Sequence, residues 1–243
     1  MKIALLMTGE CRQTWLTAPS IYKNVIEPNS ADVFLYLNKD SLIPQVDNED
    51  EIIKKAFSKN VKILIFTDDN YNKEVKDLIE SNYLKIDGFY KKLNRDKWDK
   101  QLNHHNTDQY FKVKKCCEAA VEYANKNNFK YDLILRVRPD IGWLNKFDLL
   151  LPTSPDMLYV NYSLHDVSPD NNPHLVSWVE DTCFFGGQNV MYKFCSDFSE
   201  KMVDVLEICD ERYDLSCATE KLLARCLIDG GIKEGKKIKW LRN

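Results

Sequence analysis

The chain has 243 residues, of which 44% are hydrophobic and 29% are charged. This length and composition are typical of a globular protein with one large core, or at most two small ones. A net charge of −3 provides no overall electrostatic attraction to nucleic acid, so we expect no nucleic-acid partner.

The sequence indicates neither a membrane span nor a secretory signal. No stretch approaches the ~18 apolar residues of a membrane span, so no transmembrane segment is expected. The apolar run at residues 3–7 is too short for a signal peptide. The eight cysteines are scattered and form no CxxC pair. We therefore expect reduced core thiols in a cytoplasmic protein, the alternatives being a disulfide framework or a zinc site.

Strands and helices alternate in the first third of the chain. Near-continuous apolar runs predict three strands, a buried one at residues 2–8 and two more at residues 32–38 and 61–67. Gly9 is expected to end the first strand. Residues 15–26 predict a helix that Pro19 interrupts and that closes before Pro28, and residues 47–58 predict another. This pattern favours a mostly parallel sheet covered by helices on both faces.

The rest of the chain continues the pattern after a polar, aromatic stretch at residues 85–103, predicted to be a loop-rich crossing segment. Helical periodicity is seen at residues 107–128, 188–210 and 217–228. Apolar runs predict further strands at residues 157–161 and 178–187, and another that begins at Tyr131. A basic tail, residues 233–243, follows. Without an internal repeat or a linker, we predict a single domain.

The strand that begins at Tyr131 ends in charge, with Arg136, Arg138, Pro139 and Asp140. Alternation places the two arginines on one face, and proline stiffens the exit toward Asp140. Buried charges are costly unless they are paired or bind a ligand, and ligands of open α/β sheets lie at the carboxyl ends of strands. We therefore predict a binding site here. The alternative is a structural ion-pair cluster in which Asp140 caps the next turn.

A carboxylate at such a place suits a hard divalent cation. Mg²⁺ and Mn²⁺ usually take one or two carboxylates together with phosphate oxygens. Beside arginines that could bind a diphosphate, Asp140 is therefore a candidate metal ligand.

The turn predicted after the first strand reads Thr8-Gly9-Glu10-Cys11-Arg12. Glycine allows a ligand to approach the backbone closely, and arginine can hold a phosphate in a bidentate manner. Neither GxGxxG nor GxxxxGK[ST] is present, so a dinucleotide fingerprint and a P-loop are not supported. An ordinary tight turn with a surface arginine is the alternative.

Acidic residues in the second half of the chain are candidates for deprotonating or orienting a hydroxyl of a substrate. Glu180 and Asp181 stand near the start of a predicted strand, and such a carboxylate could deprotonate or orient a hydroxyl. They could equally be strand-start acids that face solvent. Glu220 is a weaker candidate, because its position also fits a solvated helix face.

Taken in order, these motifs resemble nucleotide-sugar glycosyltransferases of the GT-A fold, in particular a loosely defined group found in large DNA viruses, bacteria and algae. The motifs concerned are Gly9-Glu10-Cys11-Arg12, Asp32-Val33-Phe34, Tyr131 to Asp140, Asp181 to Gly187 and Glu220 to Leu223. The resemblance covers most of the chain. It implies an α/β, GT-A-like, Rossmann-type fold, whose mixed, mostly parallel sheet is flanked by helices. Residues 1–140 would form the nucleotide-sugar-binding half and residues 141–243 the acceptor-side half.

The resemblance implies a nucleoside-diphosphate sugar as donor and a hydroxyl of a glycan or glycoprotein as acceptor. Thr8, Gly9 and Arg12 would contact the nucleotide. Arg136 and Arg138 would supply positive charge to the diphosphate.

The metal and the acceptor follow from the same resemblance. Asp140 would hold Mn²⁺ or Mg²⁺, with Arg138 standing where the first aspartate of the DxD motif usually stands. That departure leaves open how far the reaction depends on a metal. Asp181 would lie near the acceptor, as the base of an inverting reaction or as an orienting group in a retaining one.

Two other functions stay open at this point. A sugar-phosphate nucleotidyltransferase shares the layout of the fold, but it is expected to carry a glycine-rich loop after the first strand, where this chain has one glycine. The chain could also be a non-catalytic nucleotide-sugar-binding module. Its location is expected to be cytoplasmic, in the host cytoplasm if the chain is viral.

Overall fold

Six strands form one mixed sheet in a computed structural model that describes residues 1–11, 14–38, 49–78, 80, 100–147, 155–156, 158–163 and 178–196. The strands are β1 (Ile3–Glu10), β2 (Asp32–Asn38), β3 (Val61–Phe66), β4 (Leu133–Val137), β5 (Leu158–Ser163) and β6 (Trp178–Gly186). Their order across the sheet is β3-β2-β1-β4-β6-β5. The predicted α/β class with a mostly parallel sheet is confirmed.

The strand order creates a switch point between β1 and β4. Strands β1 to β4 are parallel where they pair, whereas β6 runs antiparallel to both of its neighbours, β4 and β5. The chain leaves β1 for β2 on one side and returns after β3 to β4 on the other side. In sheets of this kind, the carboxyl ends of the two strands at the switch point form a crevice that binds ligands.

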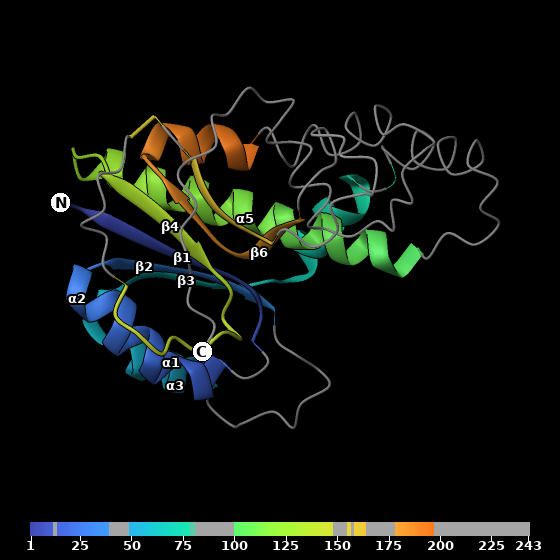
Figure 1. Ribbon diagram of the computed structural model, residues 1–243. Coiled ribbons are helices and arrows are strands. Elements are labelled where there is room, and N and C mark those ends of the chain that lie inside the picture. The colour runs from blue at the N-terminus through green and yellow to red at the C-terminus, as the bar shows by residue number, and fades with distance from the viewer. Residues whose placement is uncertain are drawn as a thin grey trace, which may run out of the picture.

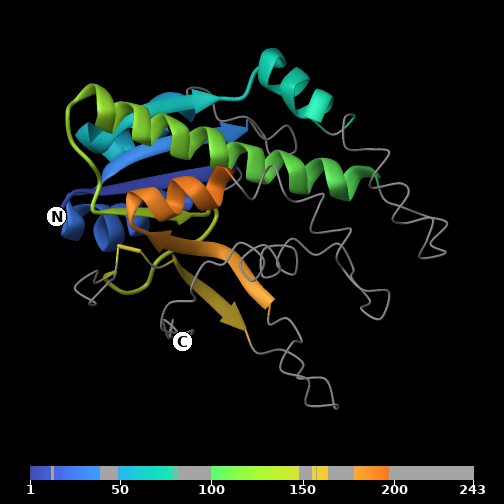
Figure 2. The same cartoon turned by 90° about the horizontal axis from the view of Figure 1, so that it is seen from above.

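Helices cover both faces of the sheet (Figures 1 and 2). One face carries α1 (Thr14–Ile21), the π-helical turn η1 (Tyr22–Ile26), α2 (Glu27–Asn29) and α3 (Glu49–Phe57), which the 3-10 turn η2 (Ser58–Asn60) follows. The other face carries α5 (Lys100–Lys126) and the helical residues 188–196. Residues 69–78, which follow β3, are also helical.

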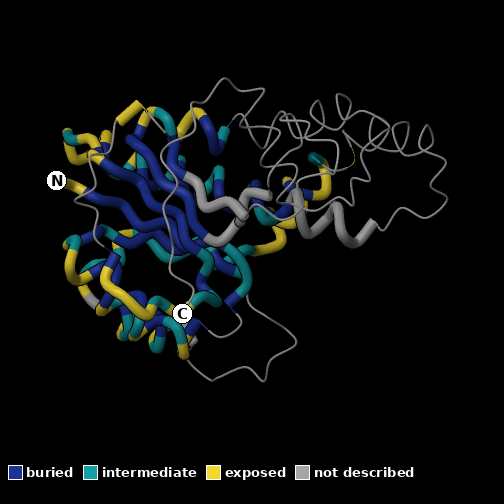
Figure 3. The backbone as a smooth tube through the Cα atoms, in the orientation of Figure 1, coloured by how far each residue is buried: buried dark blue, intermediate teal, exposed yellow. Residues whose placement is uncertain are grey.

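Alternating strand residues divide the core into two clusters. Leu6, Phe34 and Phe184 pack under α5 and residues 188–196. Leu5 and Leu135 pack on the opposite face, against α1 and α3. Figure 3 shows the buried band that runs through the strands, with exposed residues on the outer turns of the helices. Burial on both faces explains why these strands read as near-continuous apolar runs.

Three predicted boundaries were wrong. Strand β1 does not end at Gly9 but continues to Glu10, because Gly9 remains in the ladder with a φ of 137°. Helix α1 contains Pro19, and the chain stays helical through Pro28. The chain turns π-helical directly after α1, over Tyr22–Ile26.

Helix α5 begins at Lys100, earlier than the predicted residue 107, so it includes part of the expected loop. Its predicted end is confirmed, because Asn128 adopts a left-handed φ of 57° and the Phe129 N–H donates to the Ala124 carbonyl at 3.0 Å. The helix at residues 69–78 was missed. Asp68 caps it by accepting a hydrogen bond from the Tyr71 N–H at 2.9 Å.

Other predictions fall partly or wholly outside the described residues. The helix predicted at 188–210 is confirmed to residue 196, and most of the segment at 85–103 is outside. The helix at 217–228, Glu220 and the basic tail are wholly outside. In the described part of the chain, each helix is too short or too polar to traverse a bilayer.

Gly187, which follows β6, has no room for a side chain. A Cβ at this position would lie 2.3 Å from the backbone carbonyl oxygen of Pro155. We predict that Gly187→Ala lowers the free energy of unfolding by about 1–3 kcal/mol, the usual cost of forcing extra atoms into a packed site. Urea unfolding measures the change. Gly142→Ala is the matched control, because its Cβ would meet Ser20 at an ordinary 3.5 Å. Equal stabilities of the two variants would contradict this packing.

Candidate functional site

A cavity of about 230 Å³ opens at the carboxyl ends of β1 and β4, beneath the first half of α5. It therefore occupies the switch point of the sheet. Thr8 and Gly9 contribute to its wall from β1, and Pro139 from the residues that follow β4. The site predicted from the end of the charged strand is thus a pocket.

Charged side chains dominate the wall of this pocket. Three of those described are basic and three acidic: Lys112, Arg136, Arg138, Glu10, Asp108 and Asp140. Their formal charges sum to zero. The pocket is therefore not simply a positive anion trap, and the pairing of its charges decides what it can bind.

Arg138 and Asp140 form a bidentate ion pair. The Arg138 Nε donates to one Asp140 carboxylate oxygen at 2.9 Å, and an Nη donates to the other at 2.7 Å. The side chains are 30% and 19% exposed, so solvent in the pocket reaches both. Two parallel charge-assisted hydrogen bonds give this pair a defined geometry. The partner of Arg138 is thus Asp140, two residues further along the chain.

The backbone between these two residues is held in place by β1 and α1. Pro139 packs beside Gly9, where a Cβ would lie 3.6 Å from the proline ring. Thr17 of α1 donates a side-chain hydrogen bond to the Pro139 carbonyl. One turn further along α1, Ser20 accepts a hydrogen bond from the Trp143 N–H at 3.0 Å.

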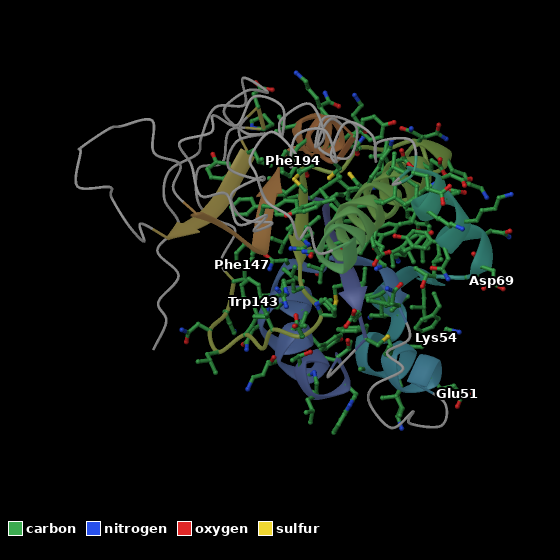
Figure 4. All side chains as sticks on the ribbon, turned by 90° about the vertical axis from the view of Figure 1, so that its right-hand side faces the viewer. Glu51, Lys54, Asp69, Trp143, Phe147 and Phe194 are labelled. Carbon is green, nitrogen blue, oxygen red and sulfur yellow. The ribbon has the colours of Figure 1, made fainter. Side chains whose placement is uncertain are left out.

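Two asparagines fasten the rest of the segment that follows β4. The Asn24 side-chain amide donates to the Trp143 carbonyl at 2.5 Å, and the Asn24 backbone carbonyl accepts from the Phe147 N–H at 2.7 Å. Asn29 donates to the Phe147 carbonyl at 3.1 Å. The Trp143 and Phe147 rings pack edge to face, with their centroids 5.3 Å apart (Figure 4). The exit from β4 is therefore a fixed edge of the pocket.

Arg136 is buried in β4, with 1% of its surface exposed. Its Nε donates to Thr8 Oγ1 at 3.4 Å, and its guanidinium carbon lies 5.3 Å from the centre of the Phe184 ring. A charge-assisted hydrogen bond and a cation–π contact both offset the cost of burying the guanidinium. Arg136 thus provides a fixed positive charge in the floor of the pocket.

Thiols surround Arg136 but do not supply a nucleophile. Burial raises the pKa of Cys183 to about 12 and the pKa of Cys116 well above its usual value, although Arg136 lowers both. Both side chains therefore stay protonated at neutral pH, and a thiolate is the form that attacks. All five cysteines that the structure describes are free and buried. Cysteine chemistry is not what this pocket offers.

Lys112 and Asp108 form a second, deeply buried ion pair on successive turns of α5. The Lys112 ammonium donates to Asp108 Oδ2, and only 1% of the lysine side chain is exposed. Asn38, at the end of β2, donates to the same carboxylate oxygen at 3.3 Å. The Tyr71 hydroxyl lies 2.9 Å from Asp108 Oδ1. Asp108 therefore ties the ends of neighbouring elements to α5.

Burial and pairing act against each other on Lys112. Burial lowers the pKa of its ammonium below the usual value, and the Asp108 carboxylate opposes this shift. The Asp108 carboxylate therefore favours the charged form of Lys112 at this wall of the pocket.

Comparison with known proteins assigns this chain to no family. No protein-family model matches it, and no curated protein is similar to it in sequence. The chemistry of the pocket is therefore argued from the side chains that form it.

The structure brings together most of the predicted site residues. Thr8, Gly9, Arg136, Arg138 and Asp140 all line this pocket. The first two belong to strand β1 and not to the predicted turn.

Two predicted site residues lie wholly or partly outside the description. Arg12 lies outside the described residues. Asp181 lies in β6, where Cys183 pairs with Val137, the last residue of β4. Because β6 runs antiparallel to β4, the Asp181 backbone lies toward the sheet edge where the pocket opens. Its side chain is outside the description.

Sequence reasoning missed Glu10, Asp108 and Lys112. A signal for the two α5 residues was present in the spacing of the apolar stripe. Residues 120 and 116 are buried on α5, and steps of four residues toward its start reach Lys112 and Asp108, which are buried as well. Two opposite charges that extend a buried stripe predict a buried ion pair.

The donor set suits a divalent cation only in part. In the described part of the chain, no three His, Cys, Asp or Glu side chains are gathered as a metal cage. Mg²⁺ and Mn²⁺ nevertheless bind through one or two carboxylates plus phosphate oxygens, and Asp140 and Glu10 line the same cavity. Asp140 fits such a site once Arg138 releases one of its oxygens.

Proposed function

We propose that the chain is a glycosyltransferase with a GT-A-like fold, which moves a sugar from a nucleoside-diphosphate sugar to a hydroxyl of a glycan or glycoprotein. One observation supports this most strongly. Arg136, Arg138 and Asp140 share a pocket at the carboxyl ends of β1 and β4. Guanidinium groups match phosphate oxygens in a bidentate manner, and the switch point of an α/β sheet is where nucleotides bind.

In this proposal, the arginines receive the diphosphate. Arg136 supplies charge from the floor and Arg138 from the rim, and both offset the charge that grows on the leaving diphosphate. Gly9 lets the ligand approach the β1 backbone, beside Thr8. Asp140 would hold Mn²⁺ or Mg²⁺, which when bound polarises phosphate oxygens as a Lewis acid. Arg12 remains a predicted nucleotide contact.

Asp181 is proposed to serve the acceptor. Its backbone lies on β6 toward the edge at which the pocket opens. A carboxylate there would accept the hydroxyl proton in an inverting reaction, or orient the hydroxyl in a retaining one. The product sugar's anomeric configuration, measured by NMR, distinguishes these roles.

Binding without turnover is the second candidate, because both Asp140 oxygens are engaged by Arg138. A thermal-shift screen of nucleoside-diphosphate sugars, each with and without Mn²⁺, tests the shared requirement. A ligand at 100 times its Kd stabilises the folded state by about 2.7 kcal/mol, so we expect one donor base to raise the Tm by several degrees. Transfer and donor hydrolysis are then assayed with that donor. Stabilisation without either reaction would favour the binding module, and no stabilisation by any donor would contradict both functions.

A further inference from the structure

The two ion pairs of the pocket differ in how far their side chains are exposed to solvent. In the Asp108–Lys112 pair, 13% of the aspartate side chain and 1% of the lysine side chain are exposed, and Asn38 and Tyr71 also bind the carboxylate. In the Arg138–Asp140 pair, 30% and 19% of the side chains are exposed to the pocket. Solvent that reaches this second pair screens part of its Coulomb attraction. Only the second pair is placed to exchange partners with a ligand.

We propose that, in the absence of ligand, the Asp140 carboxylate occupies the place on the Arg138 guanidinium that a diphosphate takes. The diphosphate replaces Asp140 on Arg138, and the released carboxylate then binds the divalent cation. This exchange rests on the proposed function, because it involves the diphosphate and the metal of that function. Arg138 thereby couples the two ligands, and each should bind more tightly when the other is present.

The surrounding backbone allows this exchange to occur by side-chain rotation. Pro139 separates the two residues and is fixed by its packing on Gly9 and by the hydrogen bond from Thr17. The backbone therefore keeps its place while the guanidinium turns toward the cavity that both side chains line. A phosphate offers the guanidinium the same fork geometry as the carboxylate it replaces.

The charge balance of the pocket explains why the cation is needed. Three basic and three acidic side chains line it, so adding a diphosphate leaves a net negative charge. A divalent cation on Asp140 offsets that excess. Without the diphosphate, Arg138 competes with the cation for the same two oxygens. The coupling is reciprocal, as any equilibrium linkage between two ligands must be.

Two isosteric substitutions separate the exchange from a merely structural ion pair. In Asp140→Asn, pyrophosphate no longer competes with a carboxylate for Arg138. Inorganic pyrophosphate without metal should therefore bind at least ~5-fold more tightly to this variant than to the wild type. In Arg138→Gln, Asp140 is released, so Mn²⁺ alone should bind at least ~5-fold more tightly while pyrophosphate binds more weakly. Isothermal titration calorimetry measures the Kd of pyrophosphate. Electron paramagnetic resonance measures the concentration of free Mn²⁺, from which the Kd of Mn²⁺ follows. Circular dichroism and thermal unfolding check that both variants fold.

Coupling is measured by repeating the pyrophosphate titration with Mn²⁺. Because Mn²⁺ also binds pyrophosphate in solution, the comparison between wild type and variant carries the result. The increase in affinity caused by Mn²⁺ should be larger in the wild type than in Asp140→Asn. Weaker metal-free pyrophosphate binding in folded Asp140→Asn, or unchanged Mn²⁺ binding in folded Arg138→Gln, would overturn the exchange. Either result leaves glycosyl transfer standing if nucleoside-diphosphate sugars still bind and react. Failure of the wild type to bind any of them would overturn both.

Discussion

Asp108→Ala is expected to lower the free energy of unfolding by about 3–5 kcal/mol, the usual cost of leaving one partner of a buried ion pair alone. The Lys112 ammonium, with 1% of its side chain exposed, would lose the carboxylate that it contacts. Asn38 and Tyr71 would lose an acceptor as well. Urea unfolding, followed by circular dichroism, measures the change.

The pH dependence of this variant has a defined sign. Burial already lowers the pKa of Lys112 below the usual 10.5, and the loss of Asp108 removes the largest opposing influence. The folded variant then releases the lysine proton at a lower pH than the unfolded chain does. Stability rises with pH wherever the unfolded state binds more protons. The deficit of Asp108→Ala should therefore shrink as the pH rises toward 10.5.

Two controls separate burial from charge. In Asp108→Leu/Lys112→Met both charges are absent, so most of the lost stability should return. Glu80→Ala removes one partner of the exposed pair with Lys76, which has the same four-residue spacing. That change should cost only the few tenths of a kcal/mol typical of exposed helical pairs. If Asp108→Ala proves no worse than Glu80→Ala, the pair at the pocket wall is not the buried interaction described above.

Buried strands could be predicted from the sequence because both faces of this sheet are covered. Residues 32–38 and 133–137 are apolar and buried at most positions, whereas β3 at the edge of the sheet is apolar but only half-buried. Helix boundaries were harder. Pro19 and Pro28 are strong local stop signals, but the packing of α1 and η1 against the sheet outweighs them.

The candidate site was predictable where it depends on strand ends. Arg136, Arg138 and Asp140 are charges that follow an apolar run, and such charges need partners. Their partners could not be predicted in full, because Asp140 turned out to be the partner of Arg138. The hydrogen bonds from Thr17 and Asn24 to the segment after β4 join residues more than a hundred positions apart, and nothing in the local sequence specifies them.

The two ion pairs of the pocket have different proposed roles, the Asp108–Lys112 pair as support and the Arg138–Asp140 pair as the place of ligand exchange. The Asp108–Lys112 pair belongs to the scaffold, because it joins α5 to the ends of β2 and to the helix after β3. The proposed exchange at Arg138 needs such a rigid wall, since a diphosphate can replace Asp140 only if the surrounding charges keep their places.

Asp140→Asn should lower the rate of sugar transfer on the order of 10²–10³-fold, the range found when one group that stabilises transition-state charge is removed. The amide keeps the shape of the carboxylate but is a poor ligand for a hard divalent cation, so charge on the leaving diphosphate is less well offset. The rates of transfer and of donor hydrolysis at saturating Mn²⁺ measure the effect. Asp69→Ala, which removes an exposed carboxylate that does not line the pocket, is the control and should react normally.

The same substitution should therefore change binding and turnover in opposite directions. Metal-free pyrophosphate gains affinity because the Asp140 carboxylate no longer competes with it for Arg138, whereas transfer is lost because the cation loses its proposed ligand. A residue needed only for folding would weaken both, and a residue needed only for donor binding would raise KM and leave kcat unchanged. Full activity of Asp140→Asn with undiminished dependence on Mn²⁺ would show that the cation binds elsewhere. The role proposed for Asp140 would then be wrong.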